Sequence, residues 1–151
     1  MRRIFLPVLL AGSLAGIVSA QQTTGAKAEA VRREITDIEL EKVAGMQRSM
    51  SEHADWLNKQ DADDLVRIGT VETSEELGAQ QSGEYKVLAM KQDGHQVFVY
   101  ANGNTAAVAY QLVGTVELKG KVFDLRHRLT DVWAKQNGEW LRVFQLVIPL
   151  E

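Results

Sequence analysis

The sequence contains no cysteine, and this absence limits what the protein can be. Disulfide bridges, zinc sites built from thiolates and a lipid anchor on a cysteine are all excluded. Proline is scarce as well. The sequence has two prolines, Pro7 and Pro149, and both lie outside the expected core elements. The interior of the chain is therefore free of the residue that most strongly interrupts helices and central strands.

An excess of basic residues is also missing. The 151 residues include 17 Lys and Arg against 20 Asp and Glu, a net charge of -3, which is unlike the basic footprint of a nucleic-acid-binding protein. The histidines His53, His95 and His127 lie on separate expected elements without a metal-ligand spacing, so we expect no metal site. Glycine-rich phosphate loops and serine-nucleophile motifs are absent too. The sequence therefore predicts no cofactor and no nucleic-acid partner.

The first twenty residues have the pattern of a cleaved signal peptide. Arg2 and Arg3 precede an apolar run, 4–18, and Val18-Ser19-Ala20 fits the small-x-small cleavage site. A retained anchor helix is the alternative, but the proline and glycines of the run weaken it. We expect a mature chain that starts at Gln21, carries 15 Lys and Arg against 20 Asp and Glu, and has no membrane segment. Its expected location is periplasmic or secreted.

Residues 21–30 are expected to form a disordered leader, and residues 31–151 one domain. Apolar residues at helical spacing predict a helix over Ala28–Met50, although a capping-box pattern at Thr36 offers a later start. A second helix is predicted over Glu52–Gln60, capped by Ser51, with Ala54 and Leu57 inward. A short strand, Leu65–Ile68, and a third helix that begins near Thr73 and ends before Gly83 should follow.

The rest of the chain has the pattern of antiparallel strands. Tyr85–Gln92 and His95–Ala101 flank a turn at Asp93-Gly94, and Thr105–Leu118 is longer. The last two strands, Lys121–Lys135 and Glu139–Val147, flank Asn137-Gly138, the strongest short hairpin signal because both turn residues need a positive φ. Helices first and a run of strands afterwards predict an α+β domain, with the helices on one face of a curved sheet.

Four short stretches in this order resemble the nuclear-transport-factor-2-like (NTF2-like) superfamily, and within it the exported SnoaL-like or DUF4440-type domains. They cover much of Ile35–Val147 and are Ala62–Leu65, Thr73–Leu77, Gly103–Val108 and the hairpin from Thr130 to Trp140. The resemblance implies a cone-shaped fold, in which N-terminal helices pack on a strongly curved antiparallel sheet. It further implies an open-ended apolar pocket and a homodimer, but it does not imply one chemistry, because this fold hosts many functions.

Strand alternation selects the candidate site residues. On the penultimate strand, one face carries Phe123, Leu125, His127, Leu129, Asp131 and Trp133. The other face carries Arg126 and Arg128. The first face is mostly apolar, so it should point toward the helices and the pocket. His127 and Asp131 are therefore the main candidates, with Trp133 beside them.

The last strand and the long strand before the hairpin add further candidates. Leu141, Val143, Gln145 and Val147 are expected inward and Arg142 outward, so that Gln145 offers a hydrogen bond to a ligand and Val143 an apolar contact. The alternation of Thr105–Leu118 leaves open whether Tyr110 or Gln111 faces the pocket.

Asp131 falls where ketosteroid isomerases of the superfamily place the acid of their oxyanion hole, which is kept neutral. The general base of those enzymes would fall near Gly69 and their tyrosine near Gly45, and neither glycine has a side chain to act. A structural role for His127 and Asp131 is therefore favoured, with Asp131 bonded to backbone or to Trp140.

Three hypotheses for the function follow. The first is a non-enzymatic domain that binds a small apolar or amphipathic molecule in the cone. The second is a lyase or isomerase that uses Asp131 and His127 as acid and base, with Gln145 orienting the substrate. The third is an interaction module that dimerises through the outer face of the sheet.

Overall fold

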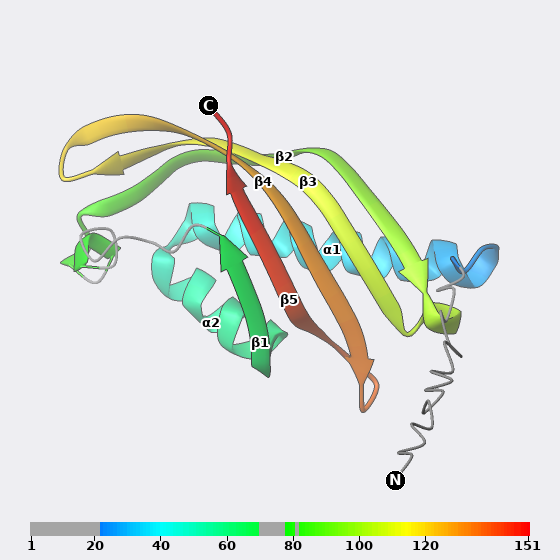
Figure 1. Cartoon of the computed structure of the whole chain (residues 1–151). Coiled ribbons are helices and arrows are strands. Elements are labelled where there is room, and N and C mark those ends of the chain that lie inside the picture. Colours follow the sequence, from blue (N-terminus) through cyan, green and yellow to red (C-terminus); the bar gives the residue numbers. More distant parts are fainter. Residues whose placement is uncertain (1–21, 70–77, 81) are drawn as a thin grey trace, which may run out of the picture.

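The computed structural model describes residues 22–69, 78–80 and 82–151. Two long helices come first and five strands follow (Figure 1). One turn of 3-10 helix, η1, lies between the second and the third strand. The elements are α1 (Ala26–Arg48), α2 (Met50–Gln60), β1 (Asp61–Gly69), β2 (Tyr85–Tyr100), η1 (Ala101–Gly103), β3 (Thr105–Leu118), β4 (Lys121–Gln136) and β5 (Glu139–Pro149).

The strands form one five-stranded sheet in the order β1-β5-β4-β3-β2. The sheet bends around the two helices, which lie on its concave side, so the predicted α+β class and its helix-on-curved-sheet arrangement are confirmed (Figure 1). Strands β2 to β5 are antiparallel as expected. Strand β1 instead pairs with β5 in parallel, so the sheet is mixed rather than wholly antiparallel. Two parallel strands need a long crossover, and here the whole of β2 to β4 separates them in the chain.

The two helices differ from the prediction in where they begin and in which residues of α2 face inward. Helix α1 begins at Ala26, so residues 26–30 of the expected leader are helical, and it runs through Thr36 without the predicted later start. The N-cap of α2 is Ser49 rather than Ser51, because the Ser49 side chain accepts the backbone N–H of Glu52 at 3.1 Å. Of the predicted inward pair, Leu57 packs against the core, whereas Ala54 is exposed, and the residues that α2 buries most fully are His53 and Trp56.

Strand β2 runs straight through the predicted turn at Asp93-Gly94. The pairing with β3 slips there by one residue, from Asp93 opposite Gln111 to Gln96 opposite Ala109. This is a β-bulge, and Gly94 adopts the positive φ of 66° that such a bulge favours. The expected strand Thr105–Leu118 and the turn at Asn137-Gly138 are confirmed, and a further turn joins β3 to β4 at Lys119-Gly120. The start of the helix expected at Thr73 lies outside the described residues, but residues 78–80 and 82 are helical and Gly83 follows in a turn with a φ of 77°, so the expected end before Gly83 is confirmed.

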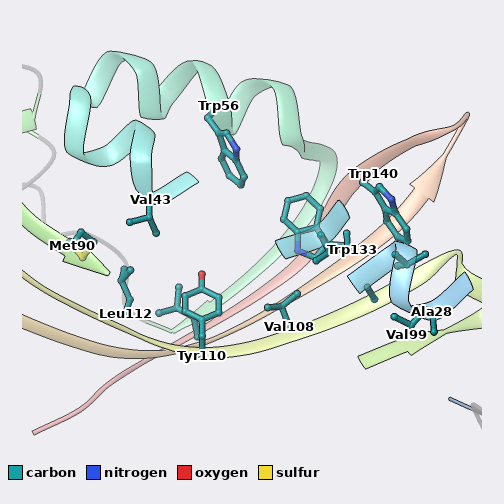
Figure 2. Packing of buried hydrophobic residues seen from close by; sticks show 14 of the residues in the cluster. Ala28, Val43, Trp56, Met90, Val99, Val108, Tyr110, Leu112, Trp133 and Trp140 are labelled. Carbon is teal, nitrogen blue, oxygen red and sulfur yellow. The ribbon is translucent and has the colours of Figure 1, made fainter. Parts of the chain in front are cut away.

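The core fills the space between the helices and the concave face of the sheet. Helix α1 contributes its apolar stripe, and β3 and β4 contribute alternate residues (Figure 2). Trp56 of α2 meets Trp133 of β4 edge to face, with ring centroids 6.1 Å apart. Among the described residues, no helix has the length and apolar character needed to cross a membrane.

Candidate functional site

The predicted alternation of β4 holds over most of the strand. Leu129, Asp131 and Trp133 are buried, and the outward Arg126 and Arg128 are exposed. Phe123 is the exception, because it is 48% exposed at the end of the strand that the helices do not cover. Strand parity therefore places Asp131 on the concave side correctly, but parity alone does not say what it meets there.

Asp131 is fully buried and accepts hydrogen bonds from four side chains. Lys42 Nζ lies 2.7 Å from Oδ2, and the hydroxyl of Tyr110 donates to the same oxygen at 3.0 Å. Gln145 Nε2 donates to Oδ1 at 2.9 Å, and Arg142 Nη1 lies 3.5 Å from it. The expected bond from Asp131 to backbone or Trp140 is replaced by this set of side chains. The structure thus brings the candidates Asp131, Gln145 and Tyr110 together, and it selects Tyr110 over Gln111.

Two partners in this cluster come from α1 and were missed in the sequence. Lys42 Nζ contacts Glu39 Oε2 at 2.6 Å and Tyr110 at 2.5 Å in addition to Asp131. Trp133 Nε1 donates to Glu39 Oε1 at 3.0 Å, which gives the candidate Trp133 a polar role in the core. The available signal was the spacing, since positions 35, 39 and 42 continue one helical face.

Arg142 is the third missed partner, and the prediction that it faces outward was wrong. A bulge in β5 causes the error: Val132 pairs with Phe144 but Trp133 pairs with Arg142, so one residue is skipped. Arg142 therefore turns inward, is 1% exposed, and donates from Nε to Asp61 Oδ1 at 2.7 Å. Val143, expected inward, is the residue skipped and is only half-buried.

The cluster places two carboxylates against one lysine, and their pKa values move in opposite directions. Burial raises the pKa of Asp131, but the charges of Lys42 and Arg142 outweigh it and lower the pKa to about 2. Burial and the charge of Asp131 raise the pKa of Glu39, which Lys42 only partly offsets. Asp131 has the better set of donors and keeps its charge. It is therefore unsuited to the neutral oxyanion acid that the isomerase resemblance implied.

Beside the cluster lies a cavity of about 280 Å³ between α1, α2 and the sheet. Its apolar wall includes three methionines and several leucines, and its polar wall includes the candidates His127 and Gln145. Asp131, Trp133, Tyr110 and Val143 are not among the residues that line it, in the part of the chain that the structure describes. Asp131 and Tyr110 thus act on the cavity only through Lys42, Arg142 and Gln145, which separate them from it. The lining residues are Lys42, Met46, Met50, His53, Ala54, Leu57, Arg67, Gln80, Tyr85, Met90, Leu112, Leu125, His127, Leu129, Arg142, Gln145 and Val147.

His53 reports the electrostatic character of this cavity. Its ring is buried and stacks near Trp56, with centroids 6.3 Å apart. Burial, together with the positive charges of Lys42, Arg142 and Arg67, lowers the pKa of His53 to about 4. His53 is therefore neutral near pH 7, and the wall around it has a positive potential.

A second hollow, of about 370 Å³, lies at the bulge of β2. Its walls include the exposed residues Asp93, Gly94, Gln96 and Arg128, so it opens to solvent on the side away from the helices. No group of three His, Asp or Glu residues with a metal-binding arrangement occurs in 22–69, 78–80 and 82–151. The cavity beneath the helices is more enclosed than this hollow and is therefore the better candidate site.

Comparison with known proteins supports the fold alone. No protein-family model matches the sequence, and no curated protein matches it. An NTF2-like protein from Cytophaga hutchinsonii is similar in structure, with a TM-score of 0.62, 21% identity, and coverage of 79% of this chain and 98% of that one. A ketosteroid isomerase-like protein from Erwinia carotovora atroseptica has a TM-score of 0.60 and 17% identity, covering 78% and 94%. The association domain of C. elegans CaMKII has a TM-score of 0.59 and 13% identity, covering 79% and 95%. The chain has the NTF2-like fold.

Within the NTF2-like fold, the two glycines at the compared isomerase positions, Gly45 and Gly69, differ in how much space surrounds them. Gly69 has a φ of 115°, and a Cβ there would lie 1.8 Å from the carbonyl oxygen of Val147, so this position cannot take a side chain without moving the backbone around it. A Cβ on Gly45 would lie 3.6 Å from the Cα of His53, which is an ordinary contact distance. Gly45 therefore lacks a catalytic side chain by sequence and not because the packing of α2 on α1 excludes one. The SnoaL-like or DUF4440-type assignment stays a prediction.

Proposed function

We propose that this protein binds a small amphipathic molecule in the cavity between its helices and its sheet. The observation that carries the proposal is the cavity of about 280 Å³, whose lining combines methionines and leucines with polar and cationic side chains. Met46, Met50 and Met90 line the apolar side, and methionine side chains adapt to ligands of different shape. The buried cluster around Asp131 forms a rigid polar floor beneath it.

Binding is better supported than the lyase or isomerase alternative. That alternative needs Asp131 and His127 to reach one substrate, yet only His127 lines the cavity. The low pKa of Asp131, about 2, also removes it as a proton donor near pH 7. Lys42 and Arg142 separate its oxygens from the cavity and hold them by ion pairs.

Filling the cavity tests the proposal. Leu125→Trp places a larger side chain in the lining, whereas Val122→Trp, on the same strand and 59% exposed, does not. Titration calorimetry with 1-octanol and with a fluorescent lipophilic probe should give saturable binding to the wild type and to Val122→Trp. Binding should weaken at least tenfold in Leu125→Trp. Equal binding by both variants, or no saturable binding to any of the three, would contradict the proposal.

Export is proposed for the same protein, because binding proteins outside the cytoplasm begin with segments like residues 1–20. The supporting pattern is Arg2-Arg3, an apolar run and Val18-Ser19-Ala20. N-terminal sequencing of protein recovered from the periplasm and the medium should begin at Gln21. A product that begins at Met1 and stays with the cell would refute this.

A homodimer through the outer face of the sheet is the remaining part of the proposal. Directly paired residues share a face, and Val66 with Phe144 and Ile68 with Leu146 put four apolar side chains there. Ile148 follows on the same face and is 44% exposed. Contiguous exposed apolar surface of this kind favours association, and one structural neighbour is an association domain.

Sedimentation of charged variants tests the dimer. Ile148→Lys should shift the wild-type dimer to monomer at micromolar concentration. Leu40→Lys, an equally apolar and exposed position on α1, should leave the dimer unchanged. A wild-type protein that sediments as a monomer would remove this part of the proposal and leave ligand binding untouched.

A further inference from the structure

The charged residues that line the cavity are all cations. Lys42, Arg67 and Arg142 belong to the wall, and no Asp or Glu of the described residues does. The carboxylates of the neighbourhood lie behind the cations, because Asp131 is fully buried beneath Lys42 and Arg142. Among the residues that the structure describes, a molecule in the cavity therefore meets guanidinium and ammonium groups and no carboxylate oxygen.

Arg67 is the cation that a ligand reaches most easily. Its side chain is 44% exposed, whereas those of Lys42 and Arg142 are almost completely buried. Asp61 bridges the two arginines, with Oδ1 2.7 Å from Arg142 Nε and Oδ2 3.4 Å from Arg67 Nη2. Asp61 thus holds the side chain of Arg67, a residue of β1, at the cavity wall, and Arg142 lies on the other side of Asp61.

The cations of the cavity have carboxylates behind them. Three cations line the cavity, and the carboxylates nearest to them are Asp61, Asp131 and Glu39. Burial and the nearby charge of Asp131 raise the pKa of Glu39. Burial first, and the charges of Lys42, Arg142 and Arg67 after it, lower the pKa of His53 at the same wall.

We propose that the ligand of this cavity is an amphipathic anion of the carboxylate class, whose head group pairs with Arg67 and whose apolar body lies against the methionines and leucines. This inference rests on the proposed function and specifies its ligand. Arg67 suits the role because its planar guanidinium binds a carboxylate through two parallel hydrogen bonds. Arg142 and Lys42, already paired, add a positive potential rather than direct contacts.

The size of the cavity limits the length of the apolar body. A volume of about 280 Å³ corresponds to roughly nine water molecules, at ~30 Å³ each. A medium-chain or small aromatic acid fits this space, whereas a long-chain lipid does not fit inside. Octanoate is a suitable probe, because 1-octanol and octylammonium have the same chain with a neutral and a cationic head.

Calorimetry with these three probes, on the purified protein at low ionic strength, tests the inference. Octanoate should bind at least tenfold more tightly than 1-octanol, and octylammonium more weakly than both. Equal affinities for octanoate and octanol would overturn the anionic head group and leave ligand binding in place. Absence of binding by all three would overturn the proposed function with it.

Variants of Arg67 locate the head group. Arg67→Gln should lose roughly tenfold in octanoate affinity and keep its octanol affinity, whereas Arg67→Lys should keep much of the preference for octanoate. Arg126→Gln removes an exposed cation from the opposite face of the sheet and should change neither affinity. Arg67→Glu should favour octylammonium over octanoate. A preference for octanoate that survives in Arg67→Gln and Arg67→Glu would show that Arg67 does not hold the head group.

Discussion

The two ends of the concave face are filled in opposite ways. At one end, which we call the closed end, Ala28, Val99, Trp133 and Trp140 pack with almost no exposed surface (Figure 2). At the other, the open end, Met46, Met90 and Leu125 surround the cavity. The cluster of Glu39, Lys42, Asp131 and Arg142 lies between them. The closed end supplies stability, and the open end exchanges packing for space that a ligand can occupy.

The largest expected effect is at the closed end. Trp133→Ala should lower the free energy of unfolding by about 3–5 kcal/mol, because it creates a large cavity and removes the indole that donates to Glu39. Leu125→Ala, beside space that is already empty, should cost about 1 kcal/mol. Urea denaturation of both variants measures the difference. Similar losses for the two would contradict the division into a closed and an open end.

The cluster between the two ends should be nearly as sensitive. Lys42→Met removes the cation shared by Asp131 and Glu39 and should lower the free energy of unfolding by about 3 kcal/mol. The loss is limited because Arg142 still faces Asp131. Adding Asp131→Asn to Lys42→Met should recover part of that loss, because the unpaired buried charge is gone. A double variant less stable than the sum of the two single changes would count against a cluster held by charge.

The wall of the open end should make the protein sensitive to mild acid. His53 titrates near its ordinary value of 6.5 in the unfolded chain and at about 4 in the folded one. Neutral His53 contributes about 3 kcal/mol to the free energy of unfolding by linkage. This contribution is complete above pH 6.5 and is lost as the pH falls from there toward 4. His53→Gln should therefore show a flatter fall in stability over that range. Lys59→Gln, an exposed change on the same helix, should keep the wild-type slope.

The smallest expected effect is that of Glu39. Because its pKa is raised in the folded protein, the unfolded chain loses this proton first, and the wild type is destabilised as the pH rises above 4.5. Glu39→Gln cannot ionise, so its stability relative to the wild type should improve as the pH rises above 4.5. Glu34→Gln, exposed on the same helix, serves as the control and should show no such trend. A trend of opposite sign would mean that Glu39 is the ionised partner of Lys42.

Part of the site could be predicted because it depends on local alternation. Strand parity places Asp131 and Leu129 on the concave side from the sequence alone, and Gln145 follows from the same rule. The rule failed at Arg142 and Val143, because a one-residue bulge in β5 reverses the faces of the residues before it. Nothing in the residues around Val143 marks that bulge.

On helix α1, the buried residues Glu39 and Lys42 were missed for a different reason. Glu39 and Lys42 lie on the same face as the apolar residues before them, but charged side chains are almost never fully buried unless they are paired. Their partner Asp131 is 89 residues from Lys42 in the chain, so the pairing could not be predicted from local pattern. The parallel position of β1 beside β5 is likewise a long-range feature.

The sequence by itself determined the order of helices and strands, the α+β class, the hairpin at Asn137-Gly138 and the faces of most of β4. These depend on neighbours a few residues apart, through turn geometry and side-chain alternation. Only the tertiary structure decided the bulges, the parallel edge strand, the buried cluster and the cavity with its cationic wall. Those features arise where distant segments meet, and their energies come from burial and charge pairing that no single segment contains.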